Sequence, residues 1–508
     1  MKLNYKRTIL VGFAFFLISA FWQAYDAIVP LILTNHYGLP QSISGVVMSL
    51  DNILAVFMLP LFGALSDKVM TRFGKRTPFI VIGTVAAVLA FVSLTFIDNY
   101  QLSTILNSGL PERYQEAAIL LKDANAALKA AGKAGDAAAV EIAQATIDSI
   151  NSSIDVIEKE TFAITCGNII PLVSFIGVLL VTLIAMATFR SPAVALMPDV
   201  TIKPLRSKGN AIINLMGTAG GILVLVLGMI FNTSGDKYMQ YTGYVLAVCG
   251  IMVLGLVIFM ATVKEKKWAD EMEEQTKALG LEENTVSANN GTRSLSKGEI
   301  KSLLLILASV ALWYIGYNSI TSKYSVYATN VLFFDFNLTL IIAQAAAVVT
   351  YIPVGIIASK IGRRKTILAG IVMLASAFFI GNFITFSTPE FVMYPVFILA
   401  GIGWATINVN SFPMVVELAK GGEVGKYTGY YYTASMAAQI VAPILSGILY
   451  SAVGEMVGGG ETGGMRVVFF AFGTIFVLAS FVTMFFVKHG DAKAERVDAL
   501  EALGGADD

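Results

Sequence analysis

Charged side chains are scarce in this sequence. Only 14% of its 508 residues are charged, whereas 56% are hydrophobic, and soluble domains carry about 25% charged residues. A soluble protein of this length would expose the surfaces of two or three domains, and 35 basic and 35 acidic residues are too few to cover them. We therefore predict that lipid covers much of the surface. The zero net charge also excludes a nucleic-acid-binding protein, which would carry a basic stripe.

Cysteine and histidine are almost absent. The two cysteines, Cys166 and Cys249, are too few for a disulfide framework. The two histidines, His36 and His489, lie far apart in predicted loops, which excludes a histidine-based metal site. The sequence also lacks the motifs HExxH, CxxC, GxSxG and GxxxxGKS/T. We therefore expect no enzymatic activity, no metal centre and no cofactor.

Long apolar runs dominate what is present. A bilayer core about 30 Å thick needs roughly 20 apolar residues of helix. The first run is too long for the apolar core of a signal peptide, and eleven more follow it. We predict an all-α membrane protein with twelve transmembrane helices, at residues 8–33, 43–66, 77–97, 167–190, 210–231, 241–263, 302–321, 338–358, 366–386, 391–416, 428–450 and 465–487.

The runs form two sets of six, and two polar stretches interrupt them. The long loop at about 98–163 is rich in alanine, which favours helix, and we expect Gly132 and Gly135 to divide it into a helical hairpin. We interpret this loop as a surface cap or spacer, with a gating or partner-binding role as the alternative. The expected organisation is an N-terminal six-helix bundle (1–263), a cytoplasmic linker with a short helix and a flexible part (264–301), a C-terminal six-helix bundle (302–487) and a cytoplasmic tail (488–508).

The distribution of lysine and arginine predicts the orientation. Of the 35 basic residues, 26 lie in segments on the same side as the N-terminus and eight on the other side. Five of these eight fall in the long loop, where the positive-inside bias is not expected to hold. We therefore expect both termini to be cytoplasmic and the protein to lie in the plasma membrane.

The two halves carry related motifs. The second run is followed by GALSDKVMTRFGKRTPFI and the eighth by GIIASKIGRRKTI, and the fourth and tenth runs each end with a proline and then a carboxylate. Such duplication is typical of transporters. We expect these acids and bases to cap and link helix ends and so to hold one conformation closed; for the basic residues, positive-inside targeting alone is the alternative. The candidate gate residues are Gly63, Asp67, Arg72, Gly74, Lys75, Arg76, Asp199, Lys360, Gly362, Arg363, Arg364 and Glu417.

The arrangement SDxxxxRxGKRxPFI at 66–80 resembles the major facilitator superfamily, above all its sucrose/proton symporters and its glycoside–pentoside–hexuronide carriers. The later segment GKYTGYYYTASMAAQIVAPILSG is also similar to these carriers. The resemblance implies alternating access around a cavity lined chiefly by the first, fourth, seventh and tenth helices. The second basic loop departs from it, with Ser359 at the position of Asp67. Melibiose-type carriers place a carboxylate pair for the cation on the second helix, where this chain has Asp51 and Asn52, so we favour protons over sodium as the coupling cation.

Three ionisable residues are expected inside the membrane, where each costs about 2.5–3.5 kcal/mol on insertion scales. At 1.5 Å per residue, Asp26 and Asp51 lie roughly 10 and 12 Å from the outer ends of their helices. Two carboxyl groups at similar depth repel each other, which suits a proton-coupling role; the alternative is that neighbouring hydroxyls or amides satisfy them. Arg190 is expected to bind a substrate hydroxyl or a carboxylate, or else to extend to the interface.

Aromatic and amide side chains recur on the helices that the resemblance places around the cavity. Aromatic rings pack against the C–H faces of sugars, and amides or carboxylates bind paired hydroxyls. Because aromatic residues near helix ends are more often interfacial, the prediction depends on the combination. The candidate substrate-binding residues are Trp22, Tyr25, Asn52, Arg190, Tyr314, Tyr317, Asn318, Gln344, Trp404, Asn408, Tyr431 and Gln439.

We therefore predict a monomeric secondary transporter that takes up a sugar or glycoside with protons, with the lipid bilayer and a small-molecule substrate as its partners and no nucleic acid. Two alternatives within transport are the efflux of drugs and the movement of lysolipids. An alternative of another class is a membrane receptor or scaffold that uses the long outer loop.

Overall fold

The structure, a computed structural model, describes residues 3–202, 205–278, 296–416, 418 and 424–488. Within these ranges the chain forms helices and no β-strand, so the prediction of an all-α protein is confirmed. Apolar runs bounded by proline, glycine and polar residues produce long helices because a buried backbone in lipid must satisfy its own hydrogen bonds.

The helices that could cross a membrane fall into two halves. In the first half, α1 packs against α7 and α3 packs against α6; in the second, α10 packs against α16 and α13 against α14. The first half contains α1 (Tyr5–Leu31) with its π-helical extension η1 (Ile32–His36), α2 (Gln41–Lys68), α3 (Thr77–Leu106), α6 (Ile170–Val200), α7 (Arg206–Ile230) and α8 (Thr242–Thr262). The second half contains α10 (Lys297–Thr321) with α11 (Tyr324–Val326) and π-helical η3 (Tyr327–Leu332), α12 (Phe336–Ile361), α13 (Arg363–Gly381), the short η4 (Glu390–Val392), α14 (Met393–Val416), α15 (Val424–Val457) and α16 (Gly460–Phe485).

Each of the twelve predicted spans corresponds to one of these helices. Eleven are long and apolar enough to cross a bilayer. The twelfth, α12, has 26 residues, of which Phe336–Tyr351 form its described apolar stretch. The chain is therefore a multi-pass integral membrane protein.

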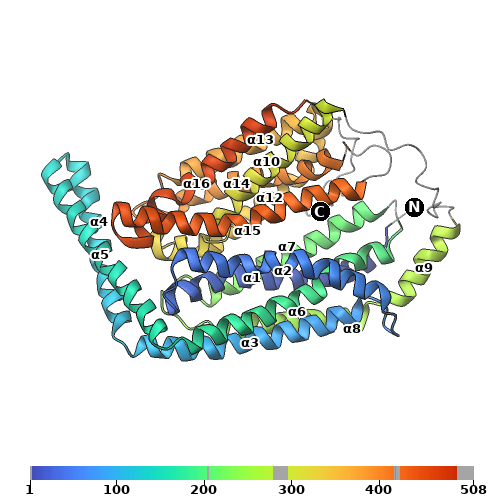
Figure 1. Ribbon diagram of the computed structural model, residues 1–508, viewed down its shortest axis with the longest axis horizontal. Coiled ribbons are helices and arrows are strands. Elements are labelled where there is room, and N and C mark those ends of the chain that lie inside the picture. Colours follow the sequence, from blue (N-terminus) through green and yellow to red (C-terminus); the bar gives the residue numbers. More distant parts are fainter. Residues whose placement is uncertain (1–2, 203–204, 279–295, 417, 419–423, 489–508) are drawn as a thin grey trace.

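The long loop of the first half forms two helices, α4 (Leu110–Ala134) and α5 (Ala137–Gly167). Gly135 ends α4 in the left-handed conformation, with a φ of 70°, and the Asp136 side chain then caps α5 by accepting a hydrogen bond from Ala139 N. Gly132, the other expected breaker, stays inside α4. Figure 1 shows this hairpin projecting beyond the bundle, at the end opposite to α9 (Glu265–Ala278).

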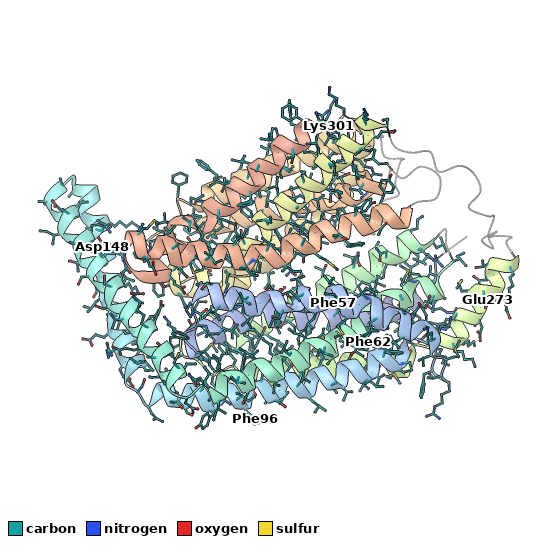
Figure 2. All side chains as sticks on the ribbon, viewed as in Figure 1. Phe57, Phe62, Phe96, Asp148, Glu273 and Lys301 are labelled. Carbon is teal, nitrogen blue, oxygen red and sulfur yellow. The ribbon has the colours of Figure 1, made fainter. Side chains whose placement is uncertain are left out.

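We call the end of the bundle that carries α4 and α5 the hairpin end, and the opposite end, which carries the turn 69–76 and α9, the basic end. Figure 2 shows Phe57 and Phe96 on the flank between these ends, where their side chains are 69% and 66% exposed. Asp148 lies on the hairpin, and Glu273 and Lys301 lie toward the basic end. An apolar flank with charges at its two ends is the surface that a bilayer covers.

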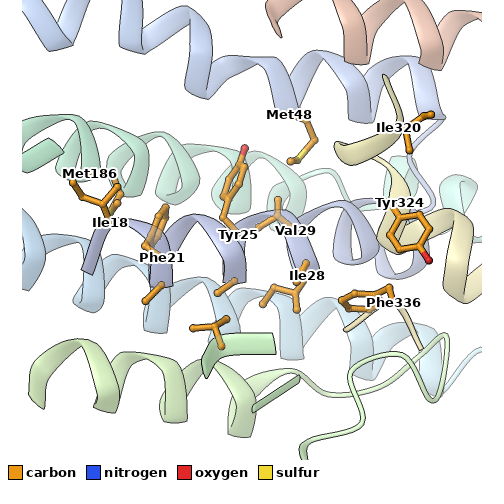
Figure 3. Packing of buried hydrophobic residues seen from close by; sticks show 14 of the residues in the cluster. Ile18, Phe21, Tyr25, Ile28, Val29, Met48, Met186, Ile320, Tyr324 and Phe336 are labelled. Carbon is orange, nitrogen blue, oxygen red and sulfur yellow. The ribbon is translucent and has the colours of Figure 1, made fainter. Parts of the chain in front are cut away.

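The core consists of interlocking apolar side chains from both halves. Figure 3 shows Tyr25 and Val29 of α1 near Met48 of α2, and Ile320 and Tyr324 of the second half in the same cluster. Since lipid tails are as apolar as these side chains, close packing rather than the hydrophobic effect holds such helices together. This one cluster includes buried side chains of both halves.

The turn before α3 is fixed by α9, the first helix after the first half. Glu265, at the start of α9, is only 3% exposed. Its carboxylate accepts hydrogen bonds of 2.6–2.8 Å from the backbone nitrogens of Lys75, Arg76 and Thr77 and from the Thr77 hydroxyl. These nitrogens lie at the N-terminus of α3. The first N–H groups of a helix have no hydrogen-bond partner within the helix, and they carry the positive end of the helix dipole.

Replacing Glu265 by alanine should remove all four hydrogen bonds and leave buried N–H groups unpaired. We expect a loss of roughly 2–4 kcal/mol of stability, measured as a lower unfolding temperature of the protein in detergent. Glu273→Ala is the control, because Glu273 is exposed on the same helix and pairs with Lys277 one turn away. Equal unfolding temperatures for the two variants would contradict this role of Glu265.

Candidate functional site

A cavity of about 600 Å³ lies between the two halves. Ligand sites in proteins have volumes of about 300–1,000 Å³, so this cavity can hold a small molecule. Its walls come from α1, α6 and α7 of the first half and from α10, α12 and α14 of the second. The predicted site residues that line it are Trp22, Asp26, Arg190, Tyr317, Asn318, Gln344 and Trp404.

The second half contributes an aromatic wall. Tyr317 of α10 stacks on Trp404 of α14, with ring centroids 5.9 Å apart and an interplanar angle of 27°. Tyr351 of α12 approaches the same tryptophan, at a centroid distance of 6.4 Å. Three helices therefore present aromatic faces to one side of the cavity. Tyr351 was not among the predicted residues.

The first half contributes a charged wall. Trp22 and Asp26 are four residues apart on α1 and so share a helix face, and the Arg190 guanidinium lies over the Trp22 ring at 5.5 Å. Asp26 is exposed to the cavity, whereas Asp51 lies half-buried behind it and accepts a hydrogen bond of 2.8 Å from Asn52. The charge of Asp51 acts on both Asp26 and Arg190. The three ionisable residues thus form one cluster, with two negative charges and one positive charge when all are ionised.

Two polar atoms beside this cluster are buried without a hydrogen-bond partner among the described residues. They are the Tyr25 hydroxyl and the Trp22 indole nitrogen. Tyr25 is fully buried, near Phe21, Val29 and Met48 in Figure 3, and does not line the cavity.

The other predicted substrate-binding residues lie away from the cavity lining. Asn52 binds Asp51, and the Tyr314 carbonyl accepts a hydrogen bond of 2.9 Å from Asn318. The Ser411 hydroxyl connects two more of them, since it donates to the Asn408 carbonyl at 3.3 Å and lies 3.0 Å from the Tyr431 hydroxyl. Gln439 is half-buried on α15.

Gln23 is a cavity residue that the sequence reasoning missed. Gln344 donates a hydrogen bond of 2.6 Å to the Gln23 side chain, which joins α12 to α1 across the cavity. Asn214 and Thr218 of α7 also line the cavity, and their spacing of four residues was a usable signal, since it places two polar side chains on one face of an apolar helix.

At the basic end, Arg76 binds two of the other predicted gate residues, Asp67 and Asp199. Its Nε donates to Asp199 at 2.7 Å and its Nη2 to Asp67 at 2.5 Å, and its Nη1 donates to the Ser66 hydroxyl. Burial by itself would lower the pKa of Arg76, but Asp199 and Asp67 raise it above the ordinary arginine value. The arginine therefore holds the ends of α2 and α6 together as a charged group.

The remaining residues of this first gate loop play smaller parts. Arg72 is exposed, with its guanidinium 4.6 Å above the ring of Phe73. Lys75 contributes its backbone nitrogen to Glu265. Gly74, which has a φ of 121°, passes so close to the Glu265 carboxylate that a Cβ would lie 2.2 Å from its Cδ. Gly63 offers its carbonyl oxygen to Arg76 at 3.5 Å.

The corresponding loop of the second half is built differently. Arg364 donates to the backbone carbonyls of Met484 and Phe485 at the C-terminus of α16, where cations are favourable. Gly362 precedes α13 with a φ of 94°, and Lys360 is exposed. The other predicted residue of this turn is Arg363, which begins α13. Glu417 lies outside the described residues.

At the hairpin end, the two halves meet through their π-helices. η1 and η3 are the extensions of α1 and α10, and the Asn330 amide of η3 donates to the Asn35 side chain of η1 at 2.7 Å. A threonine precedes each asparagine, at Thr34 and Thr329. This repeated Thr-Asn pair is a sequence signal for the contact that the sequence reasoning missed.

Helices α2 and α15 also touch at the hairpin end. A Cβ on Gly45 would lie 2.2 Å from the Pro443 carbonyl oxygen, and one on Gly447 would lie 2.3 Å from that of Gln41, so the two backbones are in contact. The buried Lys323 donates to the Ser44 hydroxyl at 2.6 Å, and Glu461 accepts from Gln41 N at 2.6 Å. These contacts close the cavity on this side.

Comparison with known proteins gives two matching family models. The model described as Major Facilitator Superfamily matches residues 326–504, and the model described as MFS/sugar transport protein matches residues 10–103. The MFS-type transporter ppzB of Metarhizium rileyi is 29% identical over 126 residues, which are 24% of this chain. The match spans only 23% of that relative's length.

Solved structures share the fold along most of the chain. The inward-open conformation of the xylose transporter XylE from E. coli has a TM-score of 0.59 at 14% identity, covering 98% of this chain and all of XylE. A D-xylose-proton symporter has a TM-score of 0.58 at 15% identity, with 97% and 100% coverage. A bacterial homologue of the iron transporter ferroportin, in its inward-facing state, has a TM-score of 0.53 at 10% identity, with 95% and 99% coverage.

The variant Gly447→Leu should be unable to close the hairpin end, because its side chain would occupy the place of the Gln41 carbonyl oxygen. Nitroxide spin labels on the exposed positions Tyr100→Cys, in α3, and Phe383→Cys, just after α13, form a reporter pair at this end. We expect double electron–electron resonance to show a longer distance than in the unchanged protein.

The reporter pair is used in protein that also carries Cys166→Ser and Cys249→Ser. The matched control is Gly429→Leu, on the same helix, because a Cβ at Gly429 meets no atom within 4 Å. If Gly447→Leu gives the same short distance between the spin labels as the control, the contact between α2 and α15 does not decide the closure of this end.

Proposed function

We propose that this chain, which belongs to the major facilitator superfamily, carries a sugar or glycoside across the membrane together with protons by alternating access. The chain is a transporter and not an enzyme. The observation that carries the proposal is the cavity between the halves, with stacked Tyr317 and Trp404 on one wall and the Asp26–Arg190 cluster on the other. The match of residues 10–103 to the MFS/sugar transport protein model, and the two structural neighbours named for xylose, support it.

A polyhydroxylated substrate suits these walls. The rings of Tyr317 and Trp404 offer flat faces to the C–H surface of a pyranose. Gln23, Gln344 and Asn318 offer amide groups, which can donate and accept at the same time. A bound hydroxyl pair would replace the hydrogen bond between Gln23 and Gln344 and so connect both halves through the substrate. These amide groups favour a polyhydroxylated substrate, while much of the remaining lining is apolar.

Proton coupling follows from the charge of the cluster. With Asp26, Asp51 and Arg190 all ionised, the cluster has a net charge of −1 inside the bilayer region, which is costly. One proton on either carboxyl group neutralises the cluster and leaves the other carboxylate to balance Arg190. Asp26 is exposed to the cavity and so can exchange a proton with the side to which the cavity opens. In symport the carrier must cross with both proton and substrate bound and return with both released. The neutral, protonated cluster therefore belongs to the loaded state, and Arg190 stabilises the carboxylates of the empty state on its return.

The positive-inside rule places the basic end in the cytoplasm. The contacts at the hairpin end would then close the outer side, which supports our proposal of an inward-facing state in the plasma membrane. We infer a monomer, because each chain contains a complete cavity between its own two halves.

The first test measures coupling in proteoliposomes. An imposed pH gradient should drive the accumulation of a labelled sugar, and the double variant Asp26→Asn/Asp51→Asn should abolish accumulation because its cluster binds no proton. Asp148→Asn, on the hairpin, is the control for loss of one carboxylate. Accumulation by the double variant at the rate of the control would refute the coupling assignment.

The second test concerns the aromatic wall. Trp404→Ala should weaken sugar binding by about tenfold, since an aromatic contact contributes roughly 0.5–1.5 kcal/mol beyond the area that it buries. Trp404→Phe keeps a ring and should lose less. The measurement is the sugar-dependent shift in unfolding temperature across a panel of mono- and disaccharides. Identical sugar dependence in all three proteins would exclude Trp404 from the binding site.

A further inference from the structure

The α4–α5 hairpin belongs to the first half by connection, because it joins α3 to α6, yet α5 packs against α16 of the second half. Asn151, Asp155 and Glu158 of α5 follow one another at intervals of four and three residues, which places them on one face of the helix. All three face the start of α16, as the contacts below establish.

The turn before α16 approaches this face of α5 closely. Gly458, Gly459 and Gly460 have successive φ values of 79°, 77° and 58°, a conformation that side chains rarely adopt. A Cβ on Gly460 would lie 1.8 Å from Asp155 Oδ1, and one on Gly459 would lie 3.1 Å from the Cβ of Asn151. The turn therefore lies against α5 with no room for a side chain at Gly460.

Polar contacts continue this interface. Thr462 donates to Glu158 Oε1 at 3.3 Å, and Arg466 Nη2 donates to Asn151 Oδ1 at 3.4 Å. The acidic side chains of α5 also lie near the N-terminus of α16, where the helix dipole favours negative charge. A second connection to the second half comes from Lys129 of α4, whose Nζ donates to the carbonyl oxygen of Ser387 at 3.2 Å.

Glu158 also anchors the hairpin to its own half. Lys237, in the connection between α7 and α8, donates to Glu158 Oε1 at 2.7 Å. Burial by itself would lower the pKa of Lys237, but the nearby Glu158 and Tyr114 raise it above the ordinary lysine value, so the contact is an ion pair. The same carboxylate oxygen thus receives one bond from each half, through Lys237 and Thr462.

We propose that the α4–α5 hairpin is a strap that holds the two halves together at the hairpin end and releases the Gly458–Gly460 turn each time that end opens. The inference rests on the alternating access proposed above. It assigns the hairpin a part in the transport cycle, in place of a passive cap or a surface for another protein.

The strap and the gate share one segment of chain. Glu461, the residue after Gly460, accepts hydrogen bonds from Gln41 N at the start of α2 and from the Ser451 hydroxyl. Docking of the turn on α5 therefore also fixes the carboxylate that caps α2. Because the contact of Glu461 with Gln41 and the docking of the turn on α5 both join the two halves, separation of the halves at this end must break them, and the free energy of docking stabilises the closed state.

Two glycines of the same turn provide a matched test. Gly460→Ala and Gly458→Ala each add one methyl group at a positive φ, but only the methyl group at Gly460 meets Asp155, since a Cβ at Gly458 has no atom within 4 Å. The reporter pair defined above measures the hairpin-end distance in lipid nanodiscs without substrate. We expect the ratio of open to closed populations to be about tenfold higher in Gly460→Ala than in Gly458→Ala. Equal ratios in the two variants would overturn the strap.

A cross-link gives the opposite perturbation and does not depend on glycine strain. For this test the reporters at positions 100 and 383 are ketone-bearing non-natural residues labelled with a hydroxylamine nitroxide, so that the thiol reagent reacts at the strap alone. Asn151→Cys and Arg466→Cys, joined by a short bifunctional thiol reagent, should abolish the open distance, and Asn151→Cys alone with the same reagent should keep it. An open population that survives cross-linking overturns the strap.

These distance measurements use no sugar and no pH gradient. They therefore test the strap even if the chain does not carry a sugar or does not use protons. A single distance in the unchanged protein under all conditions would instead contradict alternating access itself, and the strap with it.

Discussion

Asp51 interacts with a carboxylate, Asp26, and a guanidinium, Arg190, within a bundle whose flanks face lipid. Asp26 faces the cavity, whereas Asp51 and Arg190 are half-buried, so these charges are compensated by one another and by the cavity. This electrostatic constraint connects the features of the proposed transport cycle. If the cluster carries protons, as proposed, one side must close whenever the other is open, because a cluster open to both sides would conduct protons without substrate.

Backbone contact brings the two halves together at the hairpin end, whereas at the basic end an ion-pair network joins helices within the first half. Gly45 and Gly447 let α2 and α15 touch, while Arg76 links Asp67 to Asp199 within the first half. The difference follows from the surroundings. Backbone contact between helices is strong and dry where glycines allow it, whereas ion pairs near the interface can exchange their partners for water at modest cost. The second half repeats the basic loop but directs Arg364 to a helix end, so the duplication does not extend to the chemistry of the two loops.

Much of this arrangement was predictable from the sequence. The apolar runs located every membrane helix, and the candidate gate residues included Asp67, Arg76 and Asp199, which the structure brings together. Glu265 and Gln23 were missed for physical reasons. Glu265 lies in a charged linker sequence, where one buried carboxylate resembles its exposed neighbours, and Gln23 acts through Gln344, 321 residues later in the chain.

The sequence by itself determined the membrane class, the number of helices and their division into two halves, because all of these depend on local hydropathy and on chain order. Only the tertiary structure decided which side chains face the cavity, which end is closed, and that the inserted hairpin lies against the turn before α16. Those properties depend on helix rotation and on contacts between distant segments. A hydropathy pattern with similar apolar residues all around each helix does not encode them.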